Sequence, residues 1–383
     1  MEMEITMKKC ALHSLGCKVN SYETQAMQKM MESAGYEIVP FGEEIADIYI
    51  INTCSVTNIA DRKSRQMIHK AKKLNPEAVV AAAGCYVESA GDNIDEDVDI
   101  VIGNNEKSHL IEILNEYFEH MDKEKSVDIG KATDFDELNI DSPLEHTRAY
   151  VKIQDGCNRF CSYCIIPYVR GRIRSRKPDD VMAEIKRVAA SGCKEVVLTG
   201  IHLSSYGLDF KDSTVKLIDV IEAVNRIEGI ERIRLGSLEP LIVTEEFVRR
   251  LAKCKKICPH FHLSLQSGCD ETLKRMNRRY NVDEYYKGVE LLREYFPDAA
   301  VTTDVIVGFP GETEEEFNIT KKYLEKVCFY EMHVFKYSRR KGTVADRMEG
   351  QVDEKVKTQR SAILLELENK MSKEYRQQHI GCL

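Results

Sequence analysis

The sequence predicts an α/β protein with two successive parallel-sheet domains. Apolar runs alternate with amphipathic helical patterns from about residue 8 to 120, and again from 148 to 378. Regular alternation of this kind implies parallel strands. Between the two series, residues 121–147 lose the periodicity and are rich in acidic residues and lysine. A chain of 383 residues is long enough for two or three domains with their own cores.

The first domain, residues 8–120, is predicted to contain an open parallel sheet of the Rossmann or flavodoxin type. Four apolar runs have the length of buried strands, and amphipathic segments with helical spacing separate them. Strands are expected at 10–15, 47–52, 78–83 and 100–103, and helices at 23–34, 58–73 and 107–118.

The second domain, residues 148–378, is predicted to be a partial (β/α)6 barrel of the TIM type, because six strand–helix units follow one another. In such barrels the active-site residues gather at the carboxyl ends of the strands. Strands are expected at 150–153, 195–199, 232–236, 260–265, 301–308 and 332–337. Helices are expected at 179–191, 214–227, 245–253, 270–276, 282–295, 314–327 and 353–378. Residues 121–147 are expected to form an acidic linker with little core of its own.

Composition is that of an ordinary soluble globular protein, with 43% hydrophobic and 31% charged residues. No apolar run is long enough to cross a bilayer, and the N-terminus has no signal-peptide core. We therefore expect a cytoplasmic protein without a membrane partner. Thirteen cysteines in such a chain indicate metal ligation and free thiols and not a disulfide framework. The net charge of −8 disfavours nucleic-acid binding, but residues 148–177 hold eight basic residues and one acid.

Three cysteines, Cys157, Cys161 and Cys164, fall within eight residues at Cys-x3-Cys-x2-Cys spacing. Three thiolates at this spacing can bind a cubane iron–sulfur cluster and leave its fourth iron open to chelate a small molecule. A structural zinc site is the alternative, but zinc prefers a closed set of four ligands. No further Cys or His lies within ten residues on either side, so the spacing favours the open cluster.

A second set of three cysteines, Cys17, Cys54 and Cys85, is spread over the first domain. Each follows a predicted strand by a residue or two, and their separations of 37 and 31 residues match one strand–helix–strand unit. Parallel strands would place all three at the sheet edge where α/β proteins bind ligands. Gly16 and Gly84 would let the backbone turn tightly beside a bulky group. The alternative is three ordinary buried cysteines, which are common.

Around these cysteines the sequence resembles the radical S-adenosylmethionine (SAM) methylthiotransferases. The resemblance rests on residues 15–24 (Leu-Gly-Cys-Lys-Val-Asn-Ser-Tyr-Glu-Thr), on 52–57 and on 156–172, and it runs in collinear order from about residue 8 to 378. The form of residues 17–24 resembles the branch that acts on N6-threonylcarbamoyladenosine in tRNA.

The resemblance implies two [4Fe-4S] clusters, whose six cysteine ligands are the candidate catalytic residues. An auxiliary cluster would be held by Cys17, Cys54 and Cys85. The cluster that binds SAM would be held by Cys157, Cys161 and Cys164. This cluster cleaves SAM to a carbon radical, for which a flavodoxin or ferredoxin would supply the electron.

The ends of the predicted barrel strands resemble the SAM pocket of this family. Their hydroxyl, amide and carboxylate groups suit the ribose and methionine ends of SAM, and an apolar residue suits adenine. A single Ser or Gln in such a place can equally be a turn residue or a helix cap. The candidate SAM contacts are Tyr163, Gly200, Ser237, Glu239, Ser264, Gln266 and Val307.

Several other residues with metal-ligand chemistry are interpreted as structural. His202, His262 and His333 lie in or near strand ends, where a lone histidine is more often a core side chain than a ligand or base. The pair Cys254 and Cys258 trails a helix without a partner motif, and the remaining cysteines receive the same interpretation.

A basic stretch directly after the cluster loop is the candidate RNA contact. Basic side chains at the mouth of a barrel can neutralise phosphates, and a splayed anticodon-loop base could enter the pocket. A solvated charge run is the alternative. The stretch contains Arg170, Arg172, Arg174 and Arg176.

The resemblance implies addition of a methylthio group to carbon 2 of N6-threonylcarbamoyladenosine at position 37, in the tRNA anticodon loop. Two SAM molecules would be used, one as methyl donor and one as radical source. The family commonly ends in a small RNA-binding β-barrel (TRAM domain), of which residues 379–383 would be a stub. The alternatives are methylthiolation of a ribosomal-protein aspartate and a non-catalytic iron–sulfur redox or RNA-binding protein.

Overall fold

The computed structural model describes residues 8–120, 129, 132, 134–143, 147–211 and 214–381. These residues form two compact units. The first comprises residues up to 158 together with 165–201, and the second comprises 159–164 together with 202–383. Parts of the predicted linker at 121–147 and the last two residues of the predicted 379–383 stub lie outside the described residues.

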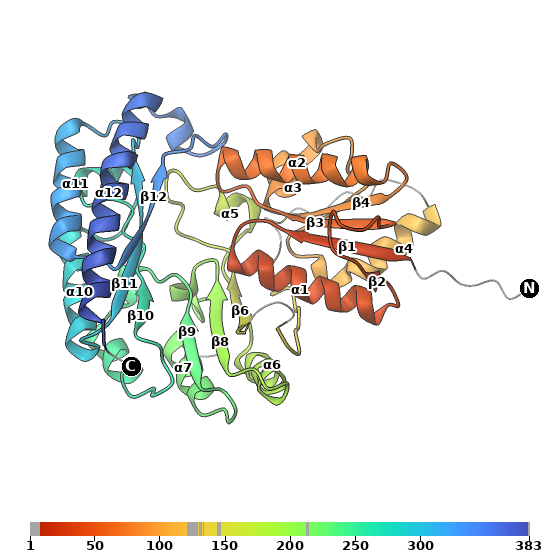
Figure 1. Cartoon of the computed structure of the whole chain (residues 1–383), viewed down its shortest axis with the longest axis horizontal. Helices are drawn as coiled ribbons and strands as arrows, with labels where there is room; N and C mark the ends of the chain where they lie inside the picture. The colour runs from red at the N-terminus through yellow and green to blue at the C-terminus, as the bar shows by residue number, and fades with distance from the viewer. Residues whose placement is uncertain are drawn as a thin grey trace, which may run out of the picture. The chain divides into compact units, whose positions relative to one another are not determined.

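A five-stranded parallel sheet forms the centre of the first unit (Figure 1). Its strand order is β2-β1-β3-β4-β5, the flavodoxin-like order, so the predicted sheet type is confirmed. The strands are β1 (Lys9–Ser14), β2 (Glu37–Ile38), β3 (Ile48–Thr53), β4 (Val79–Gly84) and β5 (Ile100–Ile102). In β3 all six residues are buried, as expected for a strand that is covered on both faces.

Helices cover both faces of this sheet, because successive strand residues point to opposite sides. In β3, Tyr49 and Ile51 pack with α2 (Asn58–Leu74) and α3 (Cys85–Ala90) in one core. Ile48 and Ile50 pack in a second core against two other helices. These are α1 (Lys18–Ser33) and α4 (Leu110–His120).

The first unit also contains the beginning of the predicted barrel. Strand β6 (Ala149–Asp155) pairs in parallel with β8 (Glu195–Gly200) and antiparallel with the short β7 (Arg174–Ser175). Between β7 and β8 lies α6 (Pro178–Ala190), and α5 (Ile166–Val169) follows the second cysteine motif. The division into units therefore does not coincide with the predicted boundary at residue 148.

The second unit contains the other four predicted barrel strands. They are β9 (Arg232–Leu235), β10 (His260–His262), β11 (Ala300–Val307) and β12 (Glu331–Lys336). The last three form a parallel sheet in the order β10-β11-β12. The helices are α7 (Leu217–Asn225), α8 (Glu245–Leu251), α9 (Asp270–Arg275), α10 (Val282–Tyr295), α11 (Glu314–Val327) and α12 (Glu354–Gln378). Figure 1 shows α10, α11 and α12 on the outer face of the β10-β11-β12 sheet.

Local sequence determines where several of these helices begin. Asn281 and Glu284 form a reciprocal capping box at the start of α10, and Thr313 and Glu316 form another at the start of α11. Such boxes satisfy backbone N–H groups that a helix leaves unpaired in its first turn. No helix in the described part of the chain is both long and apolar enough to span a membrane.

The described part of the predicted acidic linker packs within the first unit. Leu138 and Ile140 are buried. The backbone oxygen of Leu138 accepts a hydrogen bond from the Tyr22 hydroxyl, and the backbone N–H of Ile140 donates to Glu184 Oε1 at 2.7 Å. Two apolar side chains within an acidic segment are a weak sequence signal, so only the tertiary structure reveals this attachment.

Replacing Gly84 with alanine tests the close approach of β4 to the end of β3. Gly84 has φ +94°, and a Cβ there would lie 2.4 Å from the Thr53 carbonyl oxygen. We expect overlap to cost roughly 1–3 kcal/mol of unfolding free energy, in addition to strain of about 1–2 kcal/mol. Gly35→Ala is the matched control, since Gly35 has φ +88° but nothing within 4 Å of its Cβ position. Equal losses in urea unfolding would contradict the steric argument.

Candidate iron–sulfur and SAM sites

The three cysteines of the first unit lie at one edge of its sheet. Cys54 and Cys85 directly follow β3 and β4, and Cys17 follows β1 after a two-residue turn. Because β1, β3 and β4 are adjacent parallel strands, their carboxyl ends meet at the same edge. In a sheet of this order the strand order reverses between β1 and β3, which is where flavodoxin-like folds bind ligands.

The loops that carry these cysteines approach one another closely. Gly16 has φ +97°, and a Cβ there would lie 2.7 Å from Cys54 Sγ, so glycine is required beside the sulfur. Asn20, in the first turn of α1, donates through Nδ2 to the backbone oxygens of Leu15 at 2.7 Å and Thr53 at 2.8 Å. One amide thus ties the loop after β1 to the end of β3.

Burial makes the metal-free thiols hard to deprotonate. It raises the pKa of Cys54 to about 11, and the nearby Cys85 adds to this effect. Burial also raises the pKa of Cys85, although the positive charge of Arg170 opposes it. Iron binds the thiolate form, so cluster assembly would release these protons.

The guanidinium of Arg170 contacts this group of cysteines. Its Nε donates to Cys85 Sγ at 3.4 Å, and its Nη2 donates to Asn20 Oδ1 at 2.7 Å. Asn20 Oδ1 also lies 3.8 Å from Cys17 Sγ. A cation within hydrogen-bonding distance of a sulfur favours the thiolate and so suits an anionic cluster.

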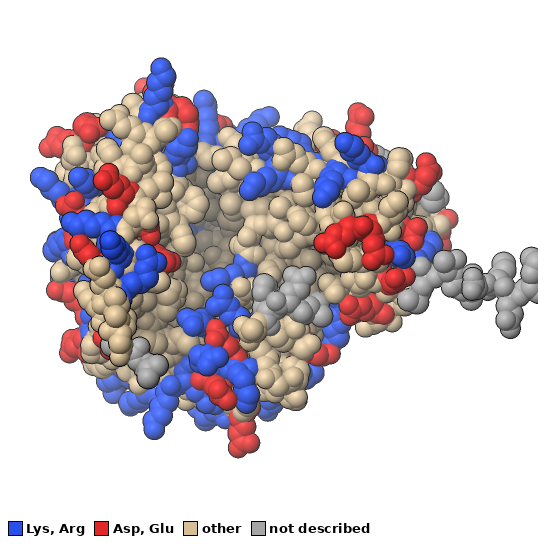
Figure 2. All heavy atoms as spheres, viewed as in Figure 1, with Lys and Arg blue, Asp and Glu red and all other residues tan. Residues whose placement is uncertain are grey.

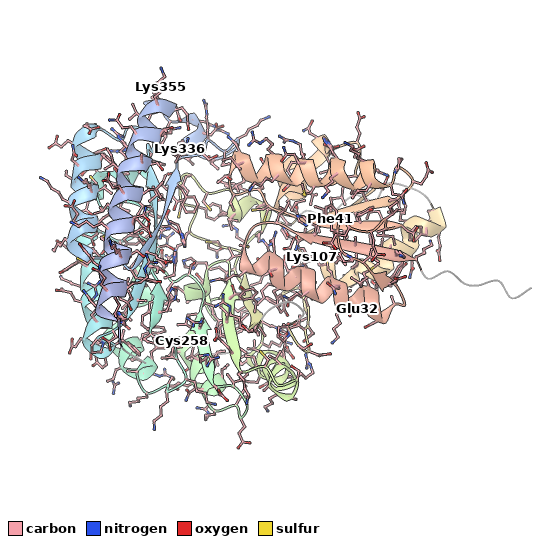
Figure 3. The ribbon with its side chains drawn as sticks, viewed as in Figure 1. Glu32, Phe41, Lys107, Cys258, Lys336 and Lys355 are labelled. Carbon is pink, nitrogen blue, oxygen red and sulfur yellow. The ribbon has the colours of Figure 1, made fainter. Side chains whose placement is uncertain are left out.

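Arg170 belongs to a fully buried network of charged side chains. Glu23 Oε1 accepts from Arg170 Nη1 at 2.7 Å and from Lys152 Nζ at 2.9 Å, and Glu23 Oε2 lies 3.2 Å from Lys107 Nζ. Asp155 Oδ2 accepts from Lys152 at 2.9 Å and from Arg170 at 3.1 Å. Lys107, labelled in Figure 3, is completely inaccessible to solvent.

The charges in this network stabilise one another. Burial by itself raises the pKa of Glu23, but Arg170, Lys107 and Lys152 together hold that pKa well below its usual range. For Asp155, burial is likewise outweighed by Lys152 and Arg170, so its pKa is also lowered. Both carboxylates are therefore charged in the folded protein at neutral pH.

Three of the four arginines in the predicted RNA-binding stretch are buried. This contradicts the expectation that the stretch is exposed. Arg170, Arg174 and Arg176 are at most 1% exposed. Arg174 Nη1 donates to the backbone oxygens of Arg170 and Arg172 at 3.0 Å, and Arg176 pairs with Glu184. Only Arg172 is exposed. The basic side chains visible in Figure 2 are interspersed with acidic ones, for example over α11 and α12.

Cys157 of the second motif lies at the end of the first unit, whereas Cys161 and Cys164 belong to the second. The backbone N–H of Cys157 donates to the Gly171 carbonyl oxygen at 3.1 Å. Gly156, just before it, has φ +68°, and a Cβ there would lie 1.8 Å from the Arg172 carbonyl oxygen. Glycine is thus required where the chain enters the motif.

In the second unit, the turn after α9 holds the middle of the cysteine motif. The N–H of Ser162 donates to the Met276 carbonyl oxygen at 3.0 Å, and its hydroxyl donates to the Arg275 carbonyl oxygen at 2.8 Å. Asn277 Nδ2 donates to the Phe160 carbonyl oxygen at 2.9 Å. These hydrogen bonds fix the segment that carries Cys161.

Arg278, from the same turn, places its positive charge next to the sulfur of Cys161. Its Nη1 donates to Cys161 Sγ at 3.2 Å, and its Nε donates to the Tyr280 hydroxyl oxygen at 3.0 Å. The Tyr280 hydroxyl in turn donates to the Ser264 carbonyl oxygen at 2.7 Å, so a predicted SAM segment is linked to the cluster loop. No motif in the sequence singles out Arg278, although it belongs to the basic pair Arg278-Arg279.

Glu239 is the predicted SAM contact with the best-defined surroundings. It is buried, pairs with Arg159, and lies 3.4 Å from His202 Nε2. Burial raises the pKa of Glu239, but His202 and Arg159 outweigh it, so this pKa is lowered. Glu239 and Arg159 line a cavity of about 270 Å³, with Ser204 and Phe247.

Most of the other predicted SAM contacts lie at or after the ends of strands, whereas Tyr163 lies within the second cysteine motif. Gln266 adopts φ +72°, a conformation that is costly for a non-glycine residue and often occurs at functional sites. Tyr163 packs edge-on against Phe309 at a centroid distance of 6.4 Å. Val307 is buried, while its neighbour Ile306 packs against the cluster of residues that includes Phe309 and Tyr163. Of the remaining three residues, Gly200 is the last residue of β8, Ser237 is exposed after β9, and Ser264 follows β10.

Two parts of the chain match known protein families. Residues 151–324 match the radical SAM superfamily, and residues 9–103 match a family described as uncharacterized protein family UPF0004. The threonylcarbamoyladenosine tRNA methylthiotransferase MtaB of Bacillus subtilis is 44% identical over 97% of this chain and 83% of its own length. The chain belongs to the radical SAM methylthiotransferase family.

A second relative supports the family, and a solved structure shares the fold. MtaB of Aquifex aeolicus is 41% identical over 97% of this chain and 91% of its own length. Among solved structures, the radical SAM methyltransferase TsrM from Kitasatospora setae has a TM-score of 0.63 at 14% identity, covering 88% of this chain and 76% of TsrM. The TsrM likeness concerns the fold alone, and it confirms the predicted α/β class.

Radical SAM methylthiotransferases use SAM and [4Fe-4S] clusters, and the residues of this chain fit both groups. One sheet edge carries Cys17, Cys54 and Cys85, and a guanidinium donates a hydrogen bond to one of their sulfurs. The sulfur of Cys161 likewise accepts a hydrogen bond from the Arg278 guanidinium. The described cysteines are free thiols. Asn20 and Glu23 were not among the predicted site residues, although both lie in the segment that carries the family resemblance.

Replacing Arg170 with methionine tests the buried network. The side chain of Met is similar in length but uncharged, so Glu23 and Asp155 would lose one of their two shared cationic partners and keep Lys152. Breaking a buried ion pair in this way costs about 3–5 kcal/mol. Arg172→Met, two residues away and exposed, should change the unfolding free energy by less than about 0.5 kcal/mol. Similar urea midpoints for the two variants would refute the structural role of Arg170.

The lowered pKa of Glu23 predicts a pH-dependent stability. A carboxyl group with a lowered folded-state pKa stabilises the protein above its unfolded pKa, about 4.3, and loses this contribution as the pH falls. Glu23→Gln should therefore destabilise the first unit by about 3–5 kcal/mol at pH 7, and this difference should shrink towards pH 3. Urea unfolding of both proteins between pH 3 and 7 measures it, and a difference independent of pH would contradict the assignment.

Proposed function

We propose that this chain methylthiolates carbon 2 of N6-threonylcarbamoyladenosine in the anticodon loop of tRNA, at position 37. The observation that carries the proposal is the presence of two sets of three cysteines in one chain. In each set, an arginine guanidinium donates a hydrogen bond to one cysteine sulfur. Arg170 donates to Cys85, and Arg278 donates to Cys161. The substrate comes from the relatives, because those with identities of 38–44% carry the threonylcarbamoyladenosine name.

Each set of cysteines has a separate role in the proposed reaction. Cys157, Cys161 and Cys164 would hold the cluster that binds SAM, and Cys17, Cys54 and Cys85 would hold the auxiliary cluster. When bound, the clusters supply the electron that cleaves SAM and the site at which sulfur is held. The chain itself places a guanidinium beside one sulfur of each set. It buries Cys54 and Cys85, which are at most 5% exposed, while Cys17 is exposed.

The candidate SAM contacts have matched chemical roles in this proposal. Glu239, kept charged by His202 and Arg159, would accept hydrogen bonds from the SAM ribose or amino group. The left-handed backbone of Gln266 would present its polar groups at the end of its strand. Ile306, packed towards Phe309 and Tyr163, is a better candidate than Val307 for the apolar contact with adenine. Tyr163, Gly200, Ser237 and Ser264 remain candidates.

Most arginines of the predicted basic stretch are buried, so other residues must contact tRNA. Of its four arginines, Arg172 is the exposed one, and it is the candidate phosphate contact. An electron donor of the flavodoxin or ferredoxin type and a cytoplasmic location are part of the proposal, since the substrate is tRNA and radical SAM chemistry needs a reductant. Methylthiolation of a ribosomal aspartate and a non-catalytic role are the two outcomes that would replace it.

The proposal predicts a defined pattern of products for two cysteine variants. Cluster-loaded protein is incubated anaerobically with SAM, a reductant and tRNA that bears threonylcarbamoyladenosine, and nucleosides are analysed by mass spectrometry. Wild type should add one methylthio group and release 5′-deoxyadenosine. Cys161→Ala should release none, whereas Cys54→Ala should still cleave SAM without inserting sulfur. Each variant should lose about four iron atoms per chain.

Cys328→Ala is the matched control, because Cys328 is exposed and lies outside both sets. It should retain the iron content and both products of the wild type. Methylthiolation by Cys54→Ala would overturn the auxiliary-cluster assignment. Modification of a ribosomal-protein aspartate but not of tRNA would replace the substrate, and the absence of both products in cluster-loaded protein would overturn the enzymatic function.

A further inference from the structure

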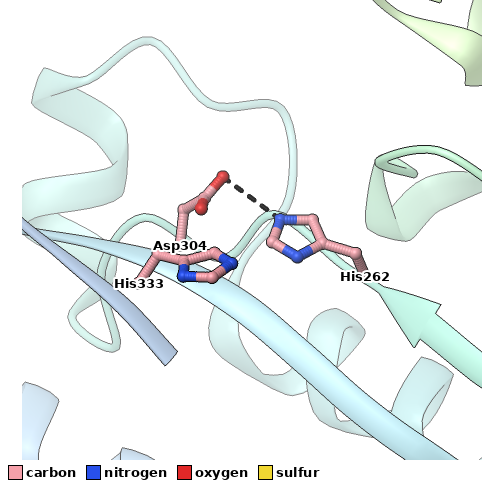
Figure 4. Close-up of side chains that lie close together, drawn as sticks. All are labelled: His262, Asp304 and His333. Atoms are coloured by element: carbon pink, nitrogen blue, oxygen red, sulfur yellow. Dashed lines mark hydrogen bonds and ion pairs between the residues drawn. The ribbon is translucent and has the colours of Figure 1, made fainter. Parts of the chain in front are cut away.

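Two histidines and an aspartate meet on one face of the β10-β11-β12 sheet, within the second unit. They are His262 on β10, Asp304 on β11 and His333 on β12. The register pairs Asp304 with His333 directly, and it pairs His262 with Thr302, which lies two residues from Asp304. Since strand side chains alternate between faces, all three point to the same side (Figure 4).

This face is not the one that packs against the helices of the unit. The neighbours with opposite orientation, Phe261, Thr303 and Met332, are at most 4% exposed. In contrast, the side chains of His262 and Asp304 are 12% and 26% exposed, and His333 is exposed. The three polar side chains therefore lie on a face that is partly open to solvent, and His333 is not the core side chain that the sequence suggested.

Their donor atoms lie close enough to share one metal ion. One donor atom from each residue lies within 4.8 Å of the others, and His262 Nε2 is 3.2 Å from Asp304 Oδ2. Bonds of about 2.0–2.2 Å to zinc or a similar ion place neighbouring ligand atoms roughly 3–3.5 Å apart. The His262–Asp304 separation already has this value. The imidazole rings of His262 and His333 are stacked at a centroid distance of 5.8 Å.

A further residue orients one of the histidines. His262 Nδ1 lies 3.1 Å from the Thr302 hydroxyl oxygen, so the ring has a polar partner on the side away from Asp304. Histidines that bind metals nearly always have such a partner on the other ring nitrogen, because it fixes the ring orientation and the tautomer. With Nδ1 held by Thr302, Nε2 is the nitrogen directed at the shared position.

We propose that His262, Asp304 and His333 bind one divalent transition-metal ion, separate from the iron–sulfur clusters. Two imidazoles and one carboxylate form a ligand set that suits Zn²⁺, Fe²⁺ and Mn²⁺. Three protein ligands leave at least one coordination position open, which water or an anionic oxygen would occupy. Among the described residues, the other group of comparable composition is His69, Asp95 and Asp97, where the His69 side chain is 55% exposed.

Ion binding to the full, cluster-loaded chain tests the proposal. Mn²⁺ is the first probe because it has little affinity for thiolates, and loss of the free Mn²⁺ signal in electron paramagnetic resonance counts the bound ions. Zn²⁺, which binds nitrogen ligands more tightly, is then added as competitor. We expect one Mn²⁺ per chain, displaced by one equivalent of Zn²⁺.

Single variants locate the bound ion. His333→Ala is the primary variant because its side chain is exposed and its loss leaves the core unchanged. It and Asp304→Asn should weaken binding at least tenfold, since loss of even an indirect partner of a metal ligand costs 10- to 100-fold. His69→Ala is the matched control and should bind as the wild type does. Circular dichroism and unchanged cluster absorption verify that each variant is folded.

Each remaining outcome would overturn the proposal. Binding that His69→Ala abolishes would place the ion at the surface group. Binding that no variant weakens would place it elsewhere on the chain. If neither Mn²⁺ nor Zn²⁺ binds the wild type at millimolar concentration, His262 and Asp304 form only an ion pair.

Discussion

The buried guanidinium of Arg170 is the interaction on which the first unit depends. An isolated charge in a protein interior is strongly unfavourable, so Arg170 is tolerated only because Glu23 and Asp155 surround it. These partners come from α1 and β6, so the charge compensation joins the parallel sheet to the first strand of the predicted barrel. The same guanidinium extends to Cys85, and the structural network therefore ends at the candidate auxiliary site.

The candidate auxiliary site follows from the topology of the sheet and from two glycines. Parallel strands bring the ends of β1, β3 and β4 together, although their cysteines are more than thirty residues apart in sequence. Gly16 and Gly84 then allow backbone to pass beside Cys54 Sγ and the Thr53 carbonyl oxygen. Because a cubane cluster needs its ligands on one side and a free position on the other, a sheet edge is a suitable place for it.

Similar chemistry recurs at the second set of cysteines. There the cation is Arg278, which a turn after α9 directs to Cys161. Neither arginine was assigned to a sulfur from the sequence. Arg170 was interpreted as an RNA contact, because an alternating basic run is equally compatible with exposed and buried side chains. Only the position of Glu23, 147 residues away, distinguishes the two cases.

The sequence by itself determined the α/β class, the order of nearly all strands and helices, and the two cysteine sets, because hydrophobic periodicity and ligand spacing are local properties. It also determined that Gly16 and Gly84 lie in tight turns beside the cysteines. Tertiary structure alone decided that Arg170, Arg174 and Arg176 are buried and that residues 134–143 join the first unit. It also brought His262, Asp304 and His333 together. These features depend on contacts between distant segments, whose pairing no local pattern encodes.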